Sequence, residues 1–214
     1  MRPETIAVHG GYTPDPTTKS VAVPIYQTTA FVFEDADHAA ALFNLQVFGN
    51  VYTRLMNPTT AVLEERVAAL ENGRAGLACA SGHSAQLLTF HTLMSPGDEF
   101  VAARQLYGGS VNQFNQSFTK FDWRVKWADT TNPDSFKAQI TDKTKVIIPV
   151  HIFGHPASMT TILTTAAENG LSVIEDAAQA FGAADGEWAV GTMGDVATIS
   201  FFPTKNFPGI GDGG

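Results

Sequence analysis

The sequence has little that would support a secreted or membrane-bound protein. Its one cysteine, Cys79, excludes an internal disulfide and a cysteine-rich zinc site, which fits a reducing compartment. No apolar run is long enough to span a bilayer, and the N-terminal segment MRPETIAVHGGYTPD lacks the apolar core of a signal peptide. We therefore expect a cytoplasmic protein with no membrane partner.

Basic residues are also scarce. The chain has 13 Lys and Arg residues against 21 Asp and Glu residues, which gives a net charge of −8, and it has no basic stripe. This charge excludes nucleic acid as a partner. The 214 residues are 44% hydrophobic and only 16% charged, so they can bury a core and predict one or at most two globular domains.

The start of the chain differs in character from the rest. Residues 1–57 are rich in turn formers and show little periodicity, and we interpret them as an arm. Asn57 can cap a helix that has Pro58 at its first position, and apolar residues at helical spacing follow. We therefore expect an N-terminal arm and then one larger domain over residues 58–214.

Short apolar runs alternate with helical patterns along the larger domain. We expect strands at residues 74–81, 98–104, 123–129, 145–151, 171–177 and 196–202. We expect helices at residues 58–71, 82–94, 108–118, 132–140 and 158–169, with a short one at 34–43 in the arm. Near-continuous apolar strands between helices predict an α/β fold with a mostly parallel sheet and helices on both faces.

The residues that follow each apolar run are the candidate site residues. Ligands of parallel α/β sheets bind beyond the carboxyl ends of the strands. These segments are residues 81–83, 107–109, 151–155, 176–179 and 204–206. His151 and His155 have the spacing of metal ligands on a helix, but the glycine and proline around them indicate a turn, so we expect packing and no metal site.

Two of these segments suggest an anion site and a buried carboxylate. Ser81 lies before a predicted helix, so the backbone amides of Gly82 and His83 could bind a phosphate, or the turn could simply cap the helix. Asp176 ends an apolar strand, where a carboxylate needs a partner. It either caps the next turn or holds a cationic ring nitrogen, with Gln179 bonded to a neighbouring oxygen.

Lys205 follows the last apolar run, near Ser200 and Thr204. It either points into water or is a buried amine whose pKa is lowered for covalent chemistry. A phosphate site, a carboxylate and a lysine in this order suit pyridoxal 5′-phosphate. The lysine would bond to the aldehyde, the carboxylate would keep the ring nitrogen protonated, and the helix terminus would bind the phosphate.

The first part of the chain resembles a known family. The segments ETIAVHGGYTPDPTTKSVAVPIYQTTAFVF, VYTRLMNPTTAVLEERVAALE, ASGHSAQ and LYGGS, within residues 1–145, are similar to Cys/Met-metabolism pyridoxal phosphate enzymes, particularly the O-acetylhomoserine sulfhydrylases. The resemblance implies that Tyr52 and Arg54 bind the cofactor phosphate of a neighbouring subunit, in a homodimer or homotetramer. It also implies that Tyr107 stacks on the cofactor ring and assists proton transfer, and that Gly82 and His83 hold the phosphate.

The later part resembles a second family. The segments VIIPVHIFGHPASM, VIEDAAQAFGA, VGTMGDVATISFFPTKN and GDGG are similar to nucleotide-sugar aminotransferases. This resemblance implies that Asp176 pairs with the ring nitrogen and Gln179 contacts the ring hydroxyl. It also implies that Ser200 contacts the phosphate and that Lys205 is the covalent lysine.

Both resemblances imply the large domain of the fold type I pyridoxal phosphate fold, but they imply different reactions. The first implies replacement of the γ-substituent of an O-acetylhomoserine-type amino acid by a sulfur nucleophile. The second implies transfer of an amino group from glutamate to a ketosugar nucleotide. Two resemblances in one chain indicate either a hybrid or an unusual lineage. Both families have considerably longer chains, so we expect the chain to be incomplete at its C-terminus, with a non-catalytic fragment as a third alternative for its function.

Overall fold

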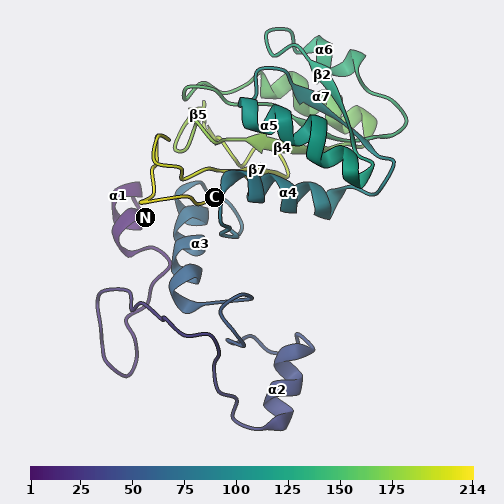
Figure 1. Cartoon of the computed structure of the whole chain (residues 1–214). Helices are drawn as coiled ribbons and strands as arrows, with labels where there is room; N and C mark the ends of the chain where they lie inside the picture. The colour runs from purple at the N-terminus through teal and green to yellow at the C-terminus, as the bar shows by residue number, and fades with distance from the viewer. The chain divides into compact units, whose positions relative to one another are not determined.

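The chain forms two compact units in the computed structural model, which describes residues 1–214 (Figure 1). The first unit is Met1–Ala78 and the second is Cys79–Gly214. None of the helices combines the length and the apolar content that a membrane span requires.

The first unit is mainly helical. Its helices are α1 (Pro3–His9), α2 (Ala36–Phe43) and α3 (Pro58–Leu70). The side chain of Asn57 accepts a hydrogen bond from the Thr59 amide at 2.9 Å, and Pro58 occupies the first turn of α3, as the sequence predicts. Arg66 of α3 donates from Nε to the Gly10 carbonyl at 2.8 Å, which attaches the end of α1 to α3.

The second unit is built on a five-stranded parallel sheet in the order β2-β1-β3-β4-β7. Its strands are β1 (Glu99–Ala103), β2 (Arg124–Ala128), β3 (Thr144–Ile148), β4 (Ser172–Asp176) and β7 (Val196–Thr198). A separate antiparallel pair consists of β5 (Ala184–Asp185) and β6 (Trp188–Ala189). The predicted parallel α/β fold is confirmed.

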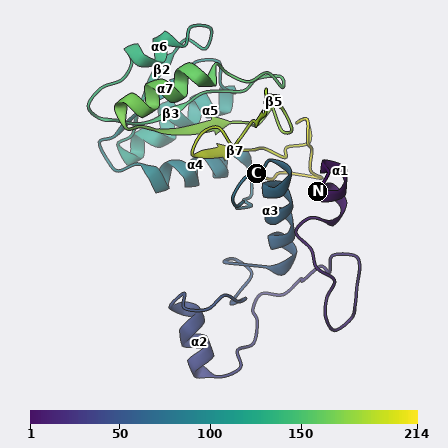
Figure 2. The same ribbon diagram turned by 180° about the vertical axis from the view of Figure 1, so that it is seen from behind.

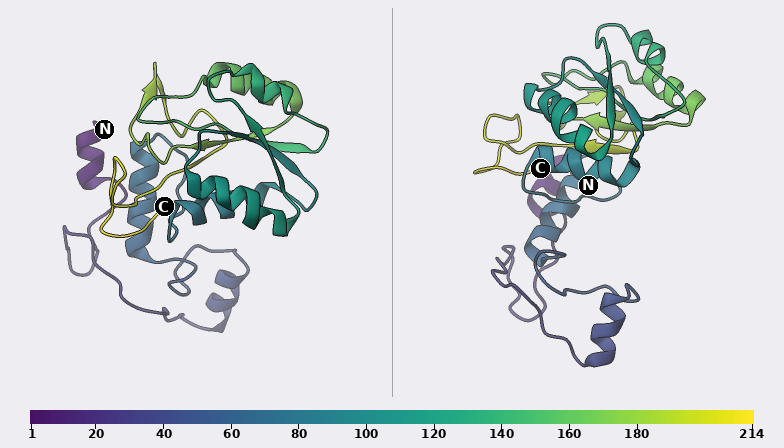
Figure 3. Two further views of the ribbon diagram at one scale, coloured as in Figure 1. Left: turned by 45° about the horizontal axis from the view of Figure 1, so that its top comes forward. Right: turned by 45° about the vertical axis from the view of Figure 1, so that its right-hand side comes forward.

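Helices cover both faces of this sheet. They are α4 (Gly82–Leu93), α5 (Gly108–Asn112), α6 (Asp134–Ala138) and α7 (Met159–Asn169), with a π-helical turn η1 (Gln113–Ser117) and a 3₁₀ turn η2 (Phe118–Phe121) after α5. The chain leaves β1 toward β2 and then returns past β1 to β3 and β4. Right-handed crossovers in opposite directions place α5 on one face and α6 and α7 on the other. Figures 2 and 3 show the teal helices α4 and α5 and the green helix α7 on opposite sides of the strands.

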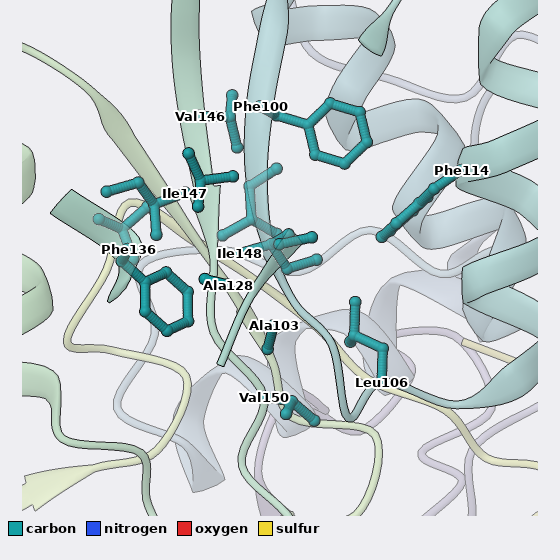
Figure 4. Close-up of a cluster of buried hydrophobic side chains, with 14 of the residues drawn as sticks. Phe100, Ala103, Leu106, Phe114, Ala128, Phe136, Val146, Ile147, Ile148 and Val150 are labelled. Carbon is teal, nitrogen blue, oxygen red and sulfur yellow. The ribbon is translucent and has the colours of Figure 1, made fainter. Parts of the chain in front are cut away.

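The core of the second unit lies against β1 and β3. Every residue of β1 is buried, as expected for a central strand covered on both faces. Phe114 of η1 and Phe136 of α6 pack on opposite sides of the strands (Figure 4). The rings of Phe100 and Phe114 are 5.0 Å apart in an edge-to-face arrangement. The sheet is thereby fixed between two apolar layers.

Two of the predicted strands differ from the structure. Residues 74–81 form no strand, so that prediction was wrong. Within this segment Cys79 exchanges backbone hydrogen bonds with Gly214, at 2.8 and 3.1 Å, and a single exchange does not build a ladder. The run at residues 196–202 is a strand only as far as Thr198, because the Phe201 amide bonds instead to the Gly213 carbonyl at 2.9 Å.

Other local features were not predicted. The helix expected at residues 108–118 begins as α5 but widens into the π-helical η1. The sequence predicted neither helix α1 nor the β5–β6 pair. All of these are short elements, for which periodicity gives a weak signal.

Glu175 is a fully buried carboxylate in β4. Its donors are His151 Nε2 (2.9 Å) and the amides of Gly191 (2.9 Å), Met193 (2.8 Å) and Gly194 (2.7 Å). The fully buried His151 also accepts at Nδ1 from the Ala157 amide, at 3.0 Å, so its imidazole is neutral with the proton on Nε2. Glu175 and His151 therefore fix the loops after β3 and before β7 to the end of β4.

We expect Glu175→Gln to destabilise the protein by about 3 kcal/mol, because a neutral amide cannot replace a buried carboxylate that accepts four hydrogen bonds. Urea denaturation measures the change, and Glu187→Gln, at an exposed position in the β5–β6 turn, is the matched control. A loss no larger than that of the control would contradict the role of the carboxylate.

The effect should depend on pH. Burial by itself raises the pKa of Glu175, but the hydrogen bonds from His151 and from the Gly194 and Gly191 amides outweigh it and lower this pKa. A carboxyl with a lowered folded-state pKa stabilises the protein above its unfolded-state pKa, and this contribution is lost as the pH falls through the folded-state value. The difference between wild type and Glu175→Gln should therefore shrink on acidification below about pH 4.

Candidate active site

A cavity of about 380 Å³ lies beyond the carboxyl ends of the strands in the second unit. Its walls come from the segments after β1, β3, β4 and β7 and from the first turns of α4 and α5. The chain reverses its direction across the sheet between β1 and β3, and open α/β sheets bind ligands at such a switch point. The topology therefore places a ligand-sized cavity at the carboxyl ends of the strands, where the sequence predicts the site residues.

Nine of the eleven predicted site residues line this cavity. They are Ser81, Gly82, His83, Tyr107, Asp176, Gln179, Ser200, Thr204 and Lys205. The other two, Tyr52 and Arg54, belong to the first unit. There Arg54 Nη2 donates to the Tyr52 hydroxyl at 3.0 Å, and the guanidinium carbon is 5.1 Å from the centre of the Tyr52 ring.

The start of α4 forms one wall of the cavity. Ser81 caps the helix, because its Oγ accepts a hydrogen bond from the Ser84 amide at 3.2 Å. A Cβ atom on Gly82 would lie 2.8 Å from Ser200 Cβ, so only glycine lets this helix terminus approach the residue after β7 so closely. The amides of Gly82 and His83 have no partner within the helix, which makes this wall suitable for an anion.

Asp176 supplies the buried charge of the site. It is the last residue of β4 and only 3% exposed. Its Oδ1 accepts from the Ala178 amide at 3.1 Å, and its Oδ2 accepts from Gln86 Nε2 at 3.1 Å. Burial raises the pKa of Asp176, against the opposing effects of the Ala178 hydrogen bond and the Lys205 charge. A cationic group in the cavity would relieve the cost of this buried carboxylate.

Gln86 and Ser110 are site residues that the sequence reasoning missed. Both are buried, and Ser110 Oγ donates to Gln86 Oε1 at 3.0 Å. One signal could have found Gln86. It lies four residues after Gly82 and three after His83, so all three share a helix face. No local pattern marks Ser110, because the contact depends on how α5 packs.

Lys205 faces the same cavity as Asp176, although 29 positions separate them in the sequence. Its ammonium nitrogen is 5.5 Å from the centre of the Tyr107 ring. In the protein without cofactor, Lys205 is partly exposed, and Phe202 beside it is 45% exposed, so the residue lies between the two alternatives of the sequence analysis. The turn after Thr198 carries Lys205 to the open side of the cavity rather than into the core.

His83 and Tyr107 stack on each other, with ring centres 5.7 Å apart and an interplanar angle of 27°. A Cβ atom on Gly109 would lie 2.5 Å from a Tyr107 ring carbon and 2.6 Å from a His83 ring carbon, which explains the glycine there. Burial lowers the pKa of His83, and the positive charge of Lys205 lowers it further. His83 therefore favours its neutral form beside Lys205.

These residues fit a phosphorylated pyridine aldehyde. The helix terminus suits the phosphate, Lys205 suits the aldehyde, and the buried Asp176 suits a protonated ring nitrogen. The arrangement is that of a pyridoxal phosphate site in a parallel α/β sheet.

Comparison with known proteins agrees with this assignment. Residues 4–186 match the model of the Cys/Met metabolism PLP-dependent enzyme family, where PLP denotes pyridoxal 5′-phosphate. The O-acetyl-L-homoserine sulfhydrylase of Leptospira meyeri is 56% identical over 145 residues, which are 68% of this chain and 33% of that protein. O-acetyl-L-homoserine sulfhydrylase 1 of Thermus thermophilus is 45% identical over 181 residues, which are 82% of this chain and 43% of that protein.

A solved structure is also similar. A Campylobacter jejuni protein assigned as an O-acetylhomoserine (thiol)-lyase, which contains N′-pyridoxyl-lysine-5′-monophosphate, superimposes with a TM-score of 0.80. It is 35% identical, and the match covers 85% of this chain and 45% of that one. This chain thus spans less than half the length of these relatives. It belongs to the Cys/Met metabolism PLP-dependent enzyme family, and its fold is that of the fold type I enzymes.

We expect the stability of Asp176→Asn, relative to that of wild type, to increase with pH in the cofactor-free protein. A carboxyl whose folded-state pKa is raised costs stability once the pH exceeds its unfolded-state pKa, and the cost grows until the pH passes the folded-state value. Asparagine avoids this cost and can still accept the Ala178 amide, while the contact of its Nδ2 with the Gln86 Nε2 donor lowers stability equally at every pH.

Urea denaturation from about pH 4 to about pH 8 measures the effect. The advantage of Asp176→Asn over wild type should increase with pH, while Asp185→Asn, at an exposed position in β5, should show no such trend. A stability difference that does not change with pH would contradict the assigned cost.

Proposed function

We propose that this chain is the cofactor-binding large domain of an O-acetylhomoserine sulfhydrylase. Such an enzyme replaces the γ-acetoxy group of O-acetylhomoserine with a sulfur nucleophile. One observation supports the proposal above the others. Asp176 and Lys205, far apart in the sequence, line one cavity together with the start of α4. Residues 58–214 would form this large domain.

Each residue has a role in the proposal. Pyridoxal phosphate, when bound, withdraws electrons from the substrate carbon next to the amino group. Lys205 would hold the cofactor and move protons at its Nζ atom, and Asp176 would keep the ring nitrogen protonated. Ser81, Gly82, His83, Ser200 and Thr204 would bind the phosphate from the start of α4 and the turn after β7. Gln179 would bond to the ring hydroxyl.

Tyr107 has a separate role near the leaving group. It is 61% exposed, and its ring lies against both His83 and the Lys205 ammonium. We propose that it stacks on the cofactor ring and assists proton transfer as acetate departs. The neutral form of His83 favours this, since a neutral imidazole does not add a second positive charge beside Lys205.

Residues 1–57 would act as an arm in a homodimer or homotetramer. Tyr52 and Arg54 would reach the cofactor phosphate of a neighbouring subunit. Support comes from their mutual contact, which presents a hydroxyl and a guanidinium together, a combination suited to phosphate. We also propose a cytoplasmic location, in keeping with a single cysteine.

A second candidate is a sugar aminotransferase that transfers an amino group from glutamate to a ketosugar nucleotide. The observation that favours it is the presence of Gln179 and Ser200 in the cavity wall, since both belong to the segments that resemble those enzymes. The high identity to sulfhydrylases over most of the chain favours the first candidate. A chain that binds the cofactor without turnover is the third.

Pyridoxal phosphate added to the protein should give a yellow absorption band that borohydride bleaches. Reduction should fix the cofactor on Lys205, which mass spectrometry of the peptides identifies. Lys205→Ala should lose both signals, whereas Lys120→Ala, at an exposed position in η2, should keep them. A colourless wild type would contradict the proposed site.

Substrate assays should separate the three candidates. We expect the protein to form homocysteine from O-acetylhomoserine and sulfide. It should not transfer an amino group from glutamate to a ketosugar nucleotide. Activity with the second pair alone would support the aminotransferase, and a cofactor-loaded protein without either activity would support the non-catalytic alternative. Lys205→Ala is the control for both assays.

A further inference from the structure

Gln86 and Ser110 have no role in the proposed chemistry above, yet both are buried, with Gln86 bonded to Asp176 and Ser110 bonded to Gln86. We propose that Gln86, oriented by Ser110, is a positioning residue that makes Asp176 selective for a ligand ring with a protonated nitrogen. This inference rests on the proposed cofactor site.

The three side chains form a continuous hydrogen-bonded chain. Ser110 donates to Gln86 Oε1 at 3.0 Å, and Gln86 Nε2 donates to Asp176 Oδ2 at 3.1 Å. Their exposed fractions are 2%, 3% and 3%, so water does not compete for these bonds. The chain joins α5, α4 and β4, and it therefore couples the carboxylate to two helices on one face of the sheet.

The polarity of this chain is fixed. The Ser110 hydroxyl uses its single proton on Gln86 Oε1, which leaves the amide nitrogen of Gln86 to face the carboxylate. The Ala178 amide donates to the other carboxylate oxygen. Both partners of Asp176 are donors and neither accepts, so a proton on Asp176 would find no acceptor among them. The unused lone pairs of the carboxylate can then accept from a ligand N–H group.

A purely structural role does not account for this arrangement. A buried carboxylate with only neutral donors around it costs more than an apolar group of the same volume. The other titratable groups that act on Asp176 are Lys205, on the cavity side, and His151, which is neutral and committed to Glu175. Lys205 acts on Asp176 only at a distance, because no side-chain cation forms an ion pair with this carboxylate, and a protonated ring nitrogen would supply a direct partner.

Ring selection tests the proposal directly. The dissociation constants of pyridoxal phosphate and of its analogue with a C–H group in place of the ring nitrogen are measured for the full 214-residue chain by fluorescence quenching. Wild type should bind pyridoxal phosphate more tightly than the analogue. Gln86→Met, which keeps the side-chain length but removes the donor, should reduce this preference about tenfold.

Two further variants complete the design. Ser110→Ala is a milder change that leaves the Gln86 amide free to turn, and it should reduce the preference by a smaller factor; it also serves if Gln86→Met does not fold. Thr89→Val removes a hydroxyl that bonds only to the Ala85 carbonyl of the same helix, and it should keep the wild-type preference.

A second measurement needs no cofactor. The carboxyl ¹³C signal of Asp176 in the free protein should titrate with a higher pKa in Gln86→Met than in wild type, because a donor to the anion is lost. If Gln86→Met weakens the binding of both ring compounds equally and leaves the pKa of Asp176 unchanged, the proposal is overturned. Gln86 would then contribute only to packing. If the wild type binds neither ring, the proposed cofactor site itself fails, and the role of Gln86 fails with it.

Discussion

The parallel pairing of β4 with β7 is the constraint on which the candidate site depends. In this register Asp176 lies opposite Thr198, and the chain needs only a short turn to bring Lys205 over the same cavity. Because the strands run in the same direction, the carboxylate and the amine emerge at one edge of the sheet. The buried aromatic layers around β1 and β3 keep that edge rigid, so the relative positions of the two groups follow from the core.

Two neighbouring carboxylates at the end of β4 have opposite functions. Successive side chains of a strand point to opposite faces, so Glu175 faces the loop before β7 while Asp176 faces the cavity. Four donors satisfy Glu175 and lower its pKa, whereas two neutral donors leave Asp176 with a raised pKa. Glu175 stabilises the fold. The negative charge of Asp176 remains unfavourable in the buried site, and a cationic ligand can stabilise it.

Much of the fold could be predicted because its signals are local. Asn57 and Pro58 define the start of α3, and the apolar runs define both ends of β1, β2 and β4 within one residue. The strand predicted at residues 74–81 failed because a strand needs a pairing partner over several residues, and there only Cys79 exchanges bonds with Gly214. The sequence left two environments open for Lys205, since an apolar run before a lysine does not specify the direction of the following turn.

The amino-acid sequence by itself indicated the Cys/Met metabolism family through residues 1–145, and it determined the parallel α/β architecture and nine residues of the cavity wall. It could do so because a strand end is recognisable locally and the rule that ligands bind there is general. Only the tertiary structure decided which groups touch Asp176 and with what polarity. Gln86 and Ser110 are 24 positions apart and meet through the packing of α5 beside α4, and a hydrogen bond between distant side chains leaves no trace in the local pattern of either.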